Sequence, residues 1–223
     1  MSAEGTTRPF PIILSAPSGA GKTTVANEML KQDPRLRFSV SLTTRPRREG
    51  EIDDGDYRFV DATEFERARD ADELAEWAVV HGHLYGTPRA EIAAALAEGS
   101  YVLLDVDVQG GMQLMQAYPD AVSVFLLPPS HAVLEERLQG RGTESPEAIQ
   151  TRIDAALNEI DCVADYQYVI VNEKVERTVE VFASIIRAEE HRRARRDSLR
   201  EWIDSRFPDR GRVDAICGSG GNR

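Results

Sequence analysis

The stretch that decides the fold runs from Pro11 to Thr23 and reads Pro-Ile-Ile-Leu-Ser-Ala-Pro-Ser-Gly-Ala-Gly-Lys-Thr. Its apolar start, residues 12–14, predicts a short strand that is buried on both faces of a sheet. The small residues at 16–21 predict a turn, and a helical pattern follows from Lys22. The core is therefore expected to begin with a strand, a tight loop and a helix.

The rest of the chain repeats this alternation around one segment of different character. Further strands are expected at 38–42, 101–108, 121–127 and 168–171, and helices at 87–99, 110–117, 130–139, 145–164 and in a long final segment. Thr87 is expected to cap the first of these helices, with Pro88 in its first turn and Gly99 at its end. Alternating strands and helices predict a parallel sheet covered on both faces.

Residues 43–87 break the pattern with a polar, basic loop, short strands and a hairpin near Gly82-His-Leu-Tyr-Gly86. They predict a small mixed insertion. The expected organisation is a flexible N-terminus at 1–9, a core formed by 10–42 and 88–206, the insertion at 43–87, and a flexible tail at 207–223.

The loop after the first strand has the spacing of a P-loop, with Ala16 in place of the usual first glycine. Small residues let backbone N–H groups curl around phosphate oxygens, and the helix from Lys22 adds its positive dipole end. Lys22 is expected on the β- and γ-phosphates, and Thr23 on Mg²⁺. The predicted fold class is a three-layer α/β fold of the P-loop NTP hydrolase type, with a central parallel sheet.

Composition excludes several other classes of protein. The 223 residues carry a formal net charge of −11, with a pI near 4.9, so we expect neither nucleic acid nor an anionic membrane as a partner. Two cysteines cannot form a disulfide framework or a four-thiolate metal site, and the four histidines have no metal-ligand spacing. No apolar run reaches the ~18 residues of a membrane span, and the N-terminus lacks the pattern of a signal peptide, so we expect a cytoplasmic protein.

A second group of residues points to an anionic acceptor. Arg45, Arg47 and Arg48 lie within four residues, with Tyr57 further along, and guanidinium groups bind phosphate with two parallel hydrogen bonds. Glu76 is a single acid in the apolar stretch Leu-Ala-Glu-Trp-Ala, where a carboxylate can accept two N–H donors such as those of a guanine edge. Tyr85 and Thr87 add a phenol and a hydroxyl to the same segment.

Asp105 and Asp107 complete this group. They are two residues apart and are therefore expected on one face of the strand at 101–108. They lie at its carboxyl end, where ligands of open α/β sheets bind. Acids on a buried strand need a cation or a donor, which favours a functional role.

Taken together, these segments resemble the guanylate kinase family, in the bacterial type of P-loop nucleoside-monophosphate kinase. The resemblance runs from about Phe10 to Arg206, and bacterial members of the family often begin the P-loop with alanine. It implies transfer of phosphate from ATP to GMP, giving ADP and GDP, with Mg²⁺, as part of purine nucleotide metabolism and GMP recycling. It also assigns roles to individual residues.

On the donor side, the resemblance implies ATP contacts from Ala16, Pro17, Ser18, Gly19, Ala20, Gly21, Lys22, Thr23, Thr24 and Asn172, the last beside the adenine. On the acceptor side, it implies that Ser41, Glu76, Thr87 and Asp107 contact the guanine base and that Arg45, Arg48, Tyr57 and Tyr85 hold the GMP phosphate; Asp105 is grouped with them. A short lid at about 138–150 matches the family's lid. The resemblance implies that Arg137, Arg141 and Arg152, in addition to Lys22, are catalytic residues.

Three alternatives stay open. The first concerns the phosphate clamp, because Pro46 directly follows Arg45, whereas the family has one residue between the arginine and the proline. If the length of the loop up to Tyr57 is kept, Arg48 is the second arginine of the clamp, which we favour. If Pro46 is instead aligned with the family's proline, Arg47 takes that role. The chain could also be a non-catalytic protein-binding module with this fold, or a kinase for another nucleoside monophosphate.

The last open question is the role of the segment from Arg187 to Arg200, which holds six arginines and three acids. We expect it to form the solvated face of an amphipathic helix. The alternatives are a contact in a homo-oligomer or a patch that binds nucleic acid.

Overall fold

The structure, a computed structural model, describes residues 6–80, 82–139, 146–197 and 199–207. The chain forms two compact units: Pro9–Arg187, and a second unit made of Met1–Arg8 with Ala188–Arg223. Each unit is described by itself.

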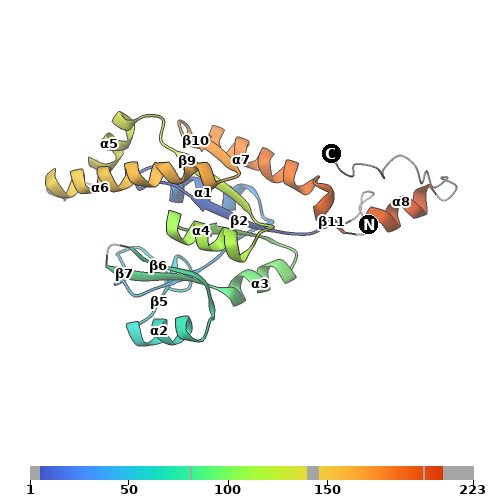
Figure 1. Ribbon diagram of the computed structural model, residues 1–223, viewed down its shortest axis with the longest axis horizontal. Coiled ribbons are helices and arrows are strands. Elements are labelled where there is room, and N and C mark those ends of the chain that lie inside the picture. Colours follow the sequence, from blue (N-terminus) through green and yellow to red (C-terminus); the bar gives the residue numbers. More distant parts are fainter. Residues whose placement is uncertain (1–5, 81, 140–145, 198, 208–223) are drawn as a thin grey trace, which may run out of the picture. The chain divides into compact units, whose positions relative to one another are not determined.

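A five-stranded, all-parallel sheet forms the centre of the larger unit (Figure 1). Its strands, in spatial order, are β10 (Tyr168–Val171), β9 (Val122–Leu127), β2 (Pro11–Ser15), β8 (Tyr101–Asp105) and β3 (Leu36–Phe38). All five residues of the central strand β2 are buried. This explains its apolar run, because a strand covered on both faces has no position for a polar side chain.

Helices cover both faces of this sheet. Ile12 and Leu14 of β2 pack in one hydrophobic cluster with α1 (Lys22–Gln32) and α7 (Val175–Glu190). Ile13, which points to the other face, packs in a second cluster with α3 (Arg89–Ala97) and α4 (Val108–Ala117). The alternation along β2 therefore produces three layers, and the predicted fold class is confirmed.

Residues 41–88 build a second, mixed sheet. Its order is β5 (Tyr57–Phe59), β4 (Ser41–Thr43), β7 (His83–Pro88) and β6 (Leu74–Val80), and α2 (Ala62–Asp70) packs on it through Phe65. In Figure 1 this sheet lies between α2 and α4. The backbone of Trp77 in β6 exchanges hydrogen bonds with the Gln113 side chain of α4, at 3.2 and 2.8 Å.

The helices α5 (His131–Gln139) and α6 (Pro146–Ile160) pack on each other through Leu134, Leu138, Ile153 and Ala156. Residues 140–145, including most of the glycine-flanked loop assigned to the lid, lie outside the described residues.

Several predicted elements differ in the structure. The expected strand at 38–42 is two strands in different sheets, because the chain leaves the central sheet after Phe38 and enters the second sheet at Ser41. The helix after residue 87 is capped by Pro88, since the Thr87 hydroxyl is engaged by Glu76. The helix predicted at 145–164 ends at Ile160 and continues as a 3₁₀ turn, Asp161–Asp165.

The predicted single helix at the C-terminus is also wrong. In the smaller unit, a 3₁₀ turn (Arg193–Arg195) and β11 (Arg196–Asp197) interrupt it before α8 (Leu199–Arg206). Glu189, 3% exposed, accepts two hydrogen bonds from Arg195, 5% exposed, at 2.9 and 3.0 Å. This buried pair joins the end of α7 to the 3₁₀ turn, and β11 then pairs with β1 (Thr6–Thr7) in the N-terminal segment expected to be flexible.

Candidate functional site

The loop between β2 and α1 borders an open cavity of about 250 Å³, here called the loop cavity. It is lined by Ala16, Pro17, Ser18, Gly19, Gly21, Lys22, Thr23, Thr24, Val80, Asp107 and Glu159. Gly19 and Gly21 have φ values of +88° and +90°, a left-handed conformation that favours glycine. These two glycines of the motif are therefore required by the curve of the backbone.

Lys22 stands at the end of the loop and is already paired. Its Nζ lies 2.5 Å from Asp105 Oδ1 at the end of β8, and donates a hydrogen bond of 2.6 Å to the Val106 carbonyl. Lys22 thus joins the loop to the carboxyl end of the neighbouring strand. Asp107 does not continue that strand as predicted; it caps α4, where its Oδ1 accepts from Gly110 N at 2.8 Å.

Asn172 and Arg137 meet on the carbonyl of Ala20. The Asn172 side-chain amide donates to it at 2.7 Å, and Arg137 Nη1 donates at 3.2 Å. The Asn172 amide oxygen accepts from Thr178 Oγ1 at 2.9 Å, so this buried side chain has both ends engaged. Both residues line a further hollow beside Gly19, Gly21 and Thr24, where sequence analysis expected the adenine.

Helix α6 reaches the loop from the other side. Arg152 Nη2 donates to Ser18 Oγ at 3.2 Å, and Glu159 Oε2 accepts from Ser18 N at 3.1 Å. Sequence analysis missed Glu159; its spacing of seven residues from Arg152 places both on one face of the helix and could have indicated it. Arg141, the third arginine assigned to the lid, lies outside the described residues.

A second hollow of about 200 Å³, here called the Glu76 cavity, lies between the two sheets. Sequence analysis had singled out eight of its lining residues: Lys22, Thr23, Ser41, Tyr57, Glu76, Tyr85, Asp105 and Asp107. Residues from the P-loop, from the central sheet and from the insertion therefore converge on one space.

Glu76 is held by a chain of hydroxyl groups. Thr87 Oγ1 donates to Glu76 Oε1 at 2.6 Å, and Ser41 Oγ lies 3.1 Å from Thr87 Oγ1. Because the single Thr87 hydrogen is committed to Glu76, Ser41 is the donor in the second bond. Burial raises the pKa of Glu76 to about 7, with the Asp107 charge adding to the rise and the Thr87 hydrogen bond opposing it. Glu76 thus titrates within the physiological range.

Arg45 lies beside this cavity without lining it. Its Nε donates to Tyr85 Oη at 3.0 Å, and its guanidinium carbon lies 5.1 Å from the centre of the Tyr57 ring. Its two terminal nitrogens bind both carboxylate oxygens of Glu51, at 2.7 and 2.5 Å. The hydrogen bonds from Arg45 lower the pKa of Glu51 to about 2, so the pair is ionised at neutral pH. The sequence analysis assigned no role to Glu51. The two candidates for the second arginine of the clamp, Arg47 and Arg48, are both exposed.

The part of the chain that the structure describes contains no group of three or more His, Cys, Asp or Glu side chains able to hold a metal ion. Among the helices described, none is both long enough and apolar enough to cross a membrane.

A parallel sheet, a P-loop opening a helix and a second polar cavity sharing its lysine define a P-loop kinase fold. The family profile for guanylate kinase matches residues 8–189, and the chain belongs to the guanylate kinase family. It is 50% identical over 183 residues to the guanylate kinase of Geobacter sulfurreducens, covering 82% of this chain and 90% of the relative. To the guanylate kinase of Agrobacterium fabrum it is 45% identical over 195 residues, 87% and 89% of the two chains.

A solved structure agrees with these relatives. The crystal structure of guanylate kinase from Anaplasma phagocytophilum matches 93% of this chain and 99% of its own, with a TM-score of 0.76 and 36% identity. The likeness therefore extends over both the central sheet and the second sheet, and the resemblance stated from sequence is confirmed.

Proposed function

We propose that the protein transfers the terminal phosphoryl group of ATP to the phosphate of GMP, giving ADP and GDP. One observation carries the proposal: the loop cavity and the Glu76 cavity share four lining residues, Lys22, Thr23, Val80 and Asp107. A donor phosphate held in the loop cavity and an acceptor phosphate reaching toward it from the Glu76 cavity therefore meet at Lys22. Such proximity is the main requirement of direct phosphoryl transfer.

On the donor side, backbone N–H groups of the P-loop bind the phosphates and Lys22 neutralises their charge. Lys22 must exchange Asp105 for phosphate oxygens when ATP enters. Arg137 and Arg152 already contact the loop, at Ala20 and Ser18, and supply positive charge to the transferring group. With Arg141 they form the proposed lid, whose closure would exclude water.

On the acceptor side, we assign the guanine base to the Glu76 cavity. The Glu76 carboxylate can accept from the N–H and amino groups of a guanine edge, with Ser41, Thr87 and Asp107 beside it. Arg45, Arg48, Tyr57 and Tyr85 are proposed to bind the GMP phosphate. An adenine edge offers no matching pair of donors to a carboxylate, so Glu76 accounts for a preference for guanine.

The residues present fit Mg²⁺ as the cofactor. Thr23 lines both cavities, and Mg²⁺ is usually held by few protein ligands together with water and substrate phosphates. When bound, Mg²⁺ neutralises charge on the donor phosphates. Thr23 would hold it through its hydroxyl. Location in the cytoplasm and self-association stay predictions.

An ADP-release assay tests the proposal across acceptors. With ATP and Mg²⁺, GMP is expected to stimulate ADP release strongly, with AMP and UMP far less effective. dGMP measures the contribution of the ribose hydroxyl. Absence of GMP-stimulated release would contradict catalysis and favour a binding module; faster release with AMP or UMP would contradict the assignment of Glu76.

A further inference from the structure

The guanidinium of Arg45 has most of its donors committed within the protein. Arginine has five side-chain N–H hydrogens. Nε binds Tyr85 Oη, Nη1 binds the Pro46 carbonyl at 2.9 Å and Glu51 Oε2 at 2.7 Å, and Nη2 binds Glu51 Oε1 at 2.5 Å. Among the described residues, one Nη2 hydrogen is left for a ligand. Arg45 is 7% exposed, so its guanidinium has little room to turn.

Glu51 also fixes the turn that follows Arg45. Its Oε2 accepts from the backbone N–H of Arg48 at 2.8 Å, and its own N–H donates to the Arg48 carbonyl at 3.3 Å. Gly50, with φ +87°, allows the reversal that returns Glu51 to Arg45. A single carboxylate therefore links both arginines of the proposed phosphate clamp, one through its side chain and the other through its backbone.

The arrangement connects directly to the Glu76 cavity. Tyr57 and Tyr85 line that cavity, and both contact Arg45, through the ring face and the hydroxyl respectively. The rings of the two tyrosines lie 5.7 Å apart at their centres. Displacing Arg45 would thus alter the wall of the acceptor site as well as the clamp itself.

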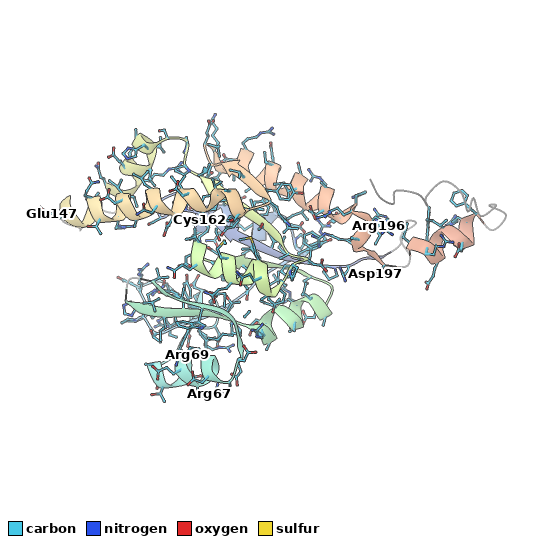
Figure 2. All side chains as sticks on the ribbon, in the orientation of Figure 1. Arg67, Arg69, Glu147, Cys162, Arg196 and Asp197 are labelled. Carbon is cyan, nitrogen blue, oxygen red and sulfur yellow. The ribbon has the colours of Figure 1, made fainter. Side chains whose placement is uncertain are left out.

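A second arginine–carboxylate pair shows what an ordinary surface contact looks like in the same segment. Arg67, on α2 (Figure 2), binds both oxygens of Glu73 at 2.9 and 3.2 Å. Its side chain is 60% exposed and that of Glu73 is 51% exposed, against 7% and 19% for Arg45 and Glu51. Neither Arg67 nor Glu73 lines either cavity.

We infer that Glu51 is a positioning residue for the acceptor phosphate: its carboxylate holds Arg45 against Tyr57 and Tyr85 and closes the turn that carries Arg48. Glu51 does not contact the reacting atoms; it acts through Arg45 and through the turn that carries Arg48. The inference rests on the proposed function for the identity of the acceptor, GMP. Its energetic basis is that a bidentate carboxylate–guanidinium pair is stronger and more directional than a single neutral hydrogen bond.

The test replaces Glu51 by Gln, with Glu73→Gln as the matched control. Glutamine keeps the shape but opposes one of its amide hydrogens to the guanidinium, so one of the two parallel bonds is lost. For E51Q we expect the KM for GMP to rise about tenfold or more, the scale of a charge-assisted hydrogen bond. The KM for ATP and kcat should stay within about twofold, as expected when ground-state and transition-state binding weaken together. E73Q should match the unmodified protein in all three.

A double-mutant cycle separates positioning from a general structural effect. R45A and E51Q should each weaken GMP binding, measured by calorimetry. The glutamine side-chain oxygen can still accept from Arg48 N, so R45A/E51Q should be no weaker than R45A alone. E51D, which keeps the charge on a shorter side chain, should fall between E51Q and the unmodified protein. This variant supplies the binding comparison if E51Q melts at a lower temperature.

Tighter GMP binding by E51Q would overturn the inference, because Glu51 would then be a competitor of the phosphate. Unchanged GMP affinity, or additive losses in R45A/E51Q, would also overturn it. Calorimetry keeps the result separate from the proposed function. A protein that binds GMP but releases no ADP contradicts the kinase assignment and still tests Glu51; absence of GMP binding in the unmodified protein contradicts both.

Discussion

The two candidate phosphate-binding regions are built from different parts of the chain. The loop at residues 16–23 presents backbone N–H groups, whose positions follow from the curve of the main chain and from glycines at positive φ. The turn at residues 45–51 presents the guanidinium of Arg45, which is placed by an acid, two tyrosines and a carbonyl. Backbone donors are fixed once the loop folds, whereas side-chain donors need partners.

Both regions nevertheless pair their cation with an acid. Lys22 is bound by Asp105, and Arg45 by Glu51. The phosphate groups of the substrates must therefore compete with these carboxylates for the two cations, in a chain whose net charge is −11. The two regions differ in the hydrogen-bond donors that remain for a phosphate. The P-loop offers a series of backbone amides, whereas Arg45, within the part of the chain that the structure describes, offers one hydrogen on Nη2. The following predictions test this difference, starting with the largest effect.

Replacing Lys22 by Ala should remove most turnover. The lysine is the one side chain shared by both cavities that can neutralise phosphate charge, and loss of one such group typically lowers kcat by about 10²–10³-fold. ADP release and a thermal melt measure activity and folding together. K31A is the control, because Lys31 is a 74% exposed residue of the same helix. Normal turnover of K22A would contradict the assigned role of the loop.

Replacing Glu76 by Gln should weaken GMP binding by about 1.5–3 kcal/mol, the range for a hydrogen bond to a charged group. The same change should raise the melting temperature of the nucleotide-free protein at pH 8, because it removes a buried charge. Calorimetry and thermal melts measure the two effects. Loss of binding together with a lower melting temperature would indicate a structural role for Glu76 instead.

The pH dependence follows from the same group. With the pKa of Glu76 raised to about 7 by burial, the carboxylate that accepts from guanine is lost as pH falls. The KM for GMP should therefore rise roughly tenfold between pH 8 and pH 6, one decade per unit below the pKa. A flat profile in that range would contradict the role of the ionised form.

The stability of the nucleotide-free protein should respond in the opposite direction. The folded pKa of Glu76 lies above its unfolded value, so its contribution is fully present below the unfolded pKa and is lost as pH rises through about 7. Unfolding by denaturant at several pH values should show this fall, and E76Q should abolish it.

Substitution of the second arginine of the phosphate clamp should have a smaller effect on the KM for GMP. Arg48→Ala should raise the KM for GMP about 1.4-fold to fivefold, the scale of an exposed charge contact of ~0.2–1 kcal/mol. Arg47→Ala should have no effect, although Arg47 is the neighbouring residue and is also exposed. The reverse result would identify Arg47 as the second arginine of the phosphate clamp and would show that Pro46 aligns with the proline of the family pattern.

The smallest expected effect is that of salt. Recognition through enclosed, paired donors depends little on long-range attraction, so raising the salt concentration from about 50 to 200 mM should change the KM for GMP less than about twofold. A steep rise, measured at constant free Mg²⁺, would show that attraction by exposed arginines dominates.

The contrast also explains which parts of the site were predictable. The P-loop is contiguous, and Glu76 stands out as an acid in an apolar strand, so both could be identified from sequence. Glu51 looked like one of many acids in a polar loop, and its partner depends on the turn at Gly50. The break after α7 was missed because a helical pattern does not anticipate the buried Glu189–Arg195 pair.

The position of β2 in the sheet has a consequence for how the chain folds. The strand lies between β8 and β9, so its partners are not synthesised until after residues 101 and 122. Meanwhile the second sheet, contained within residues 41–88 and with its own small core around Phe65, can form from local contacts. A growing chain would thus complete the wall of the acceptor site while an apolar strand of the donor site still has both edges exposed. Such edges favour aggregation, so nascent chains that stop before β9 should depend most on chaperones.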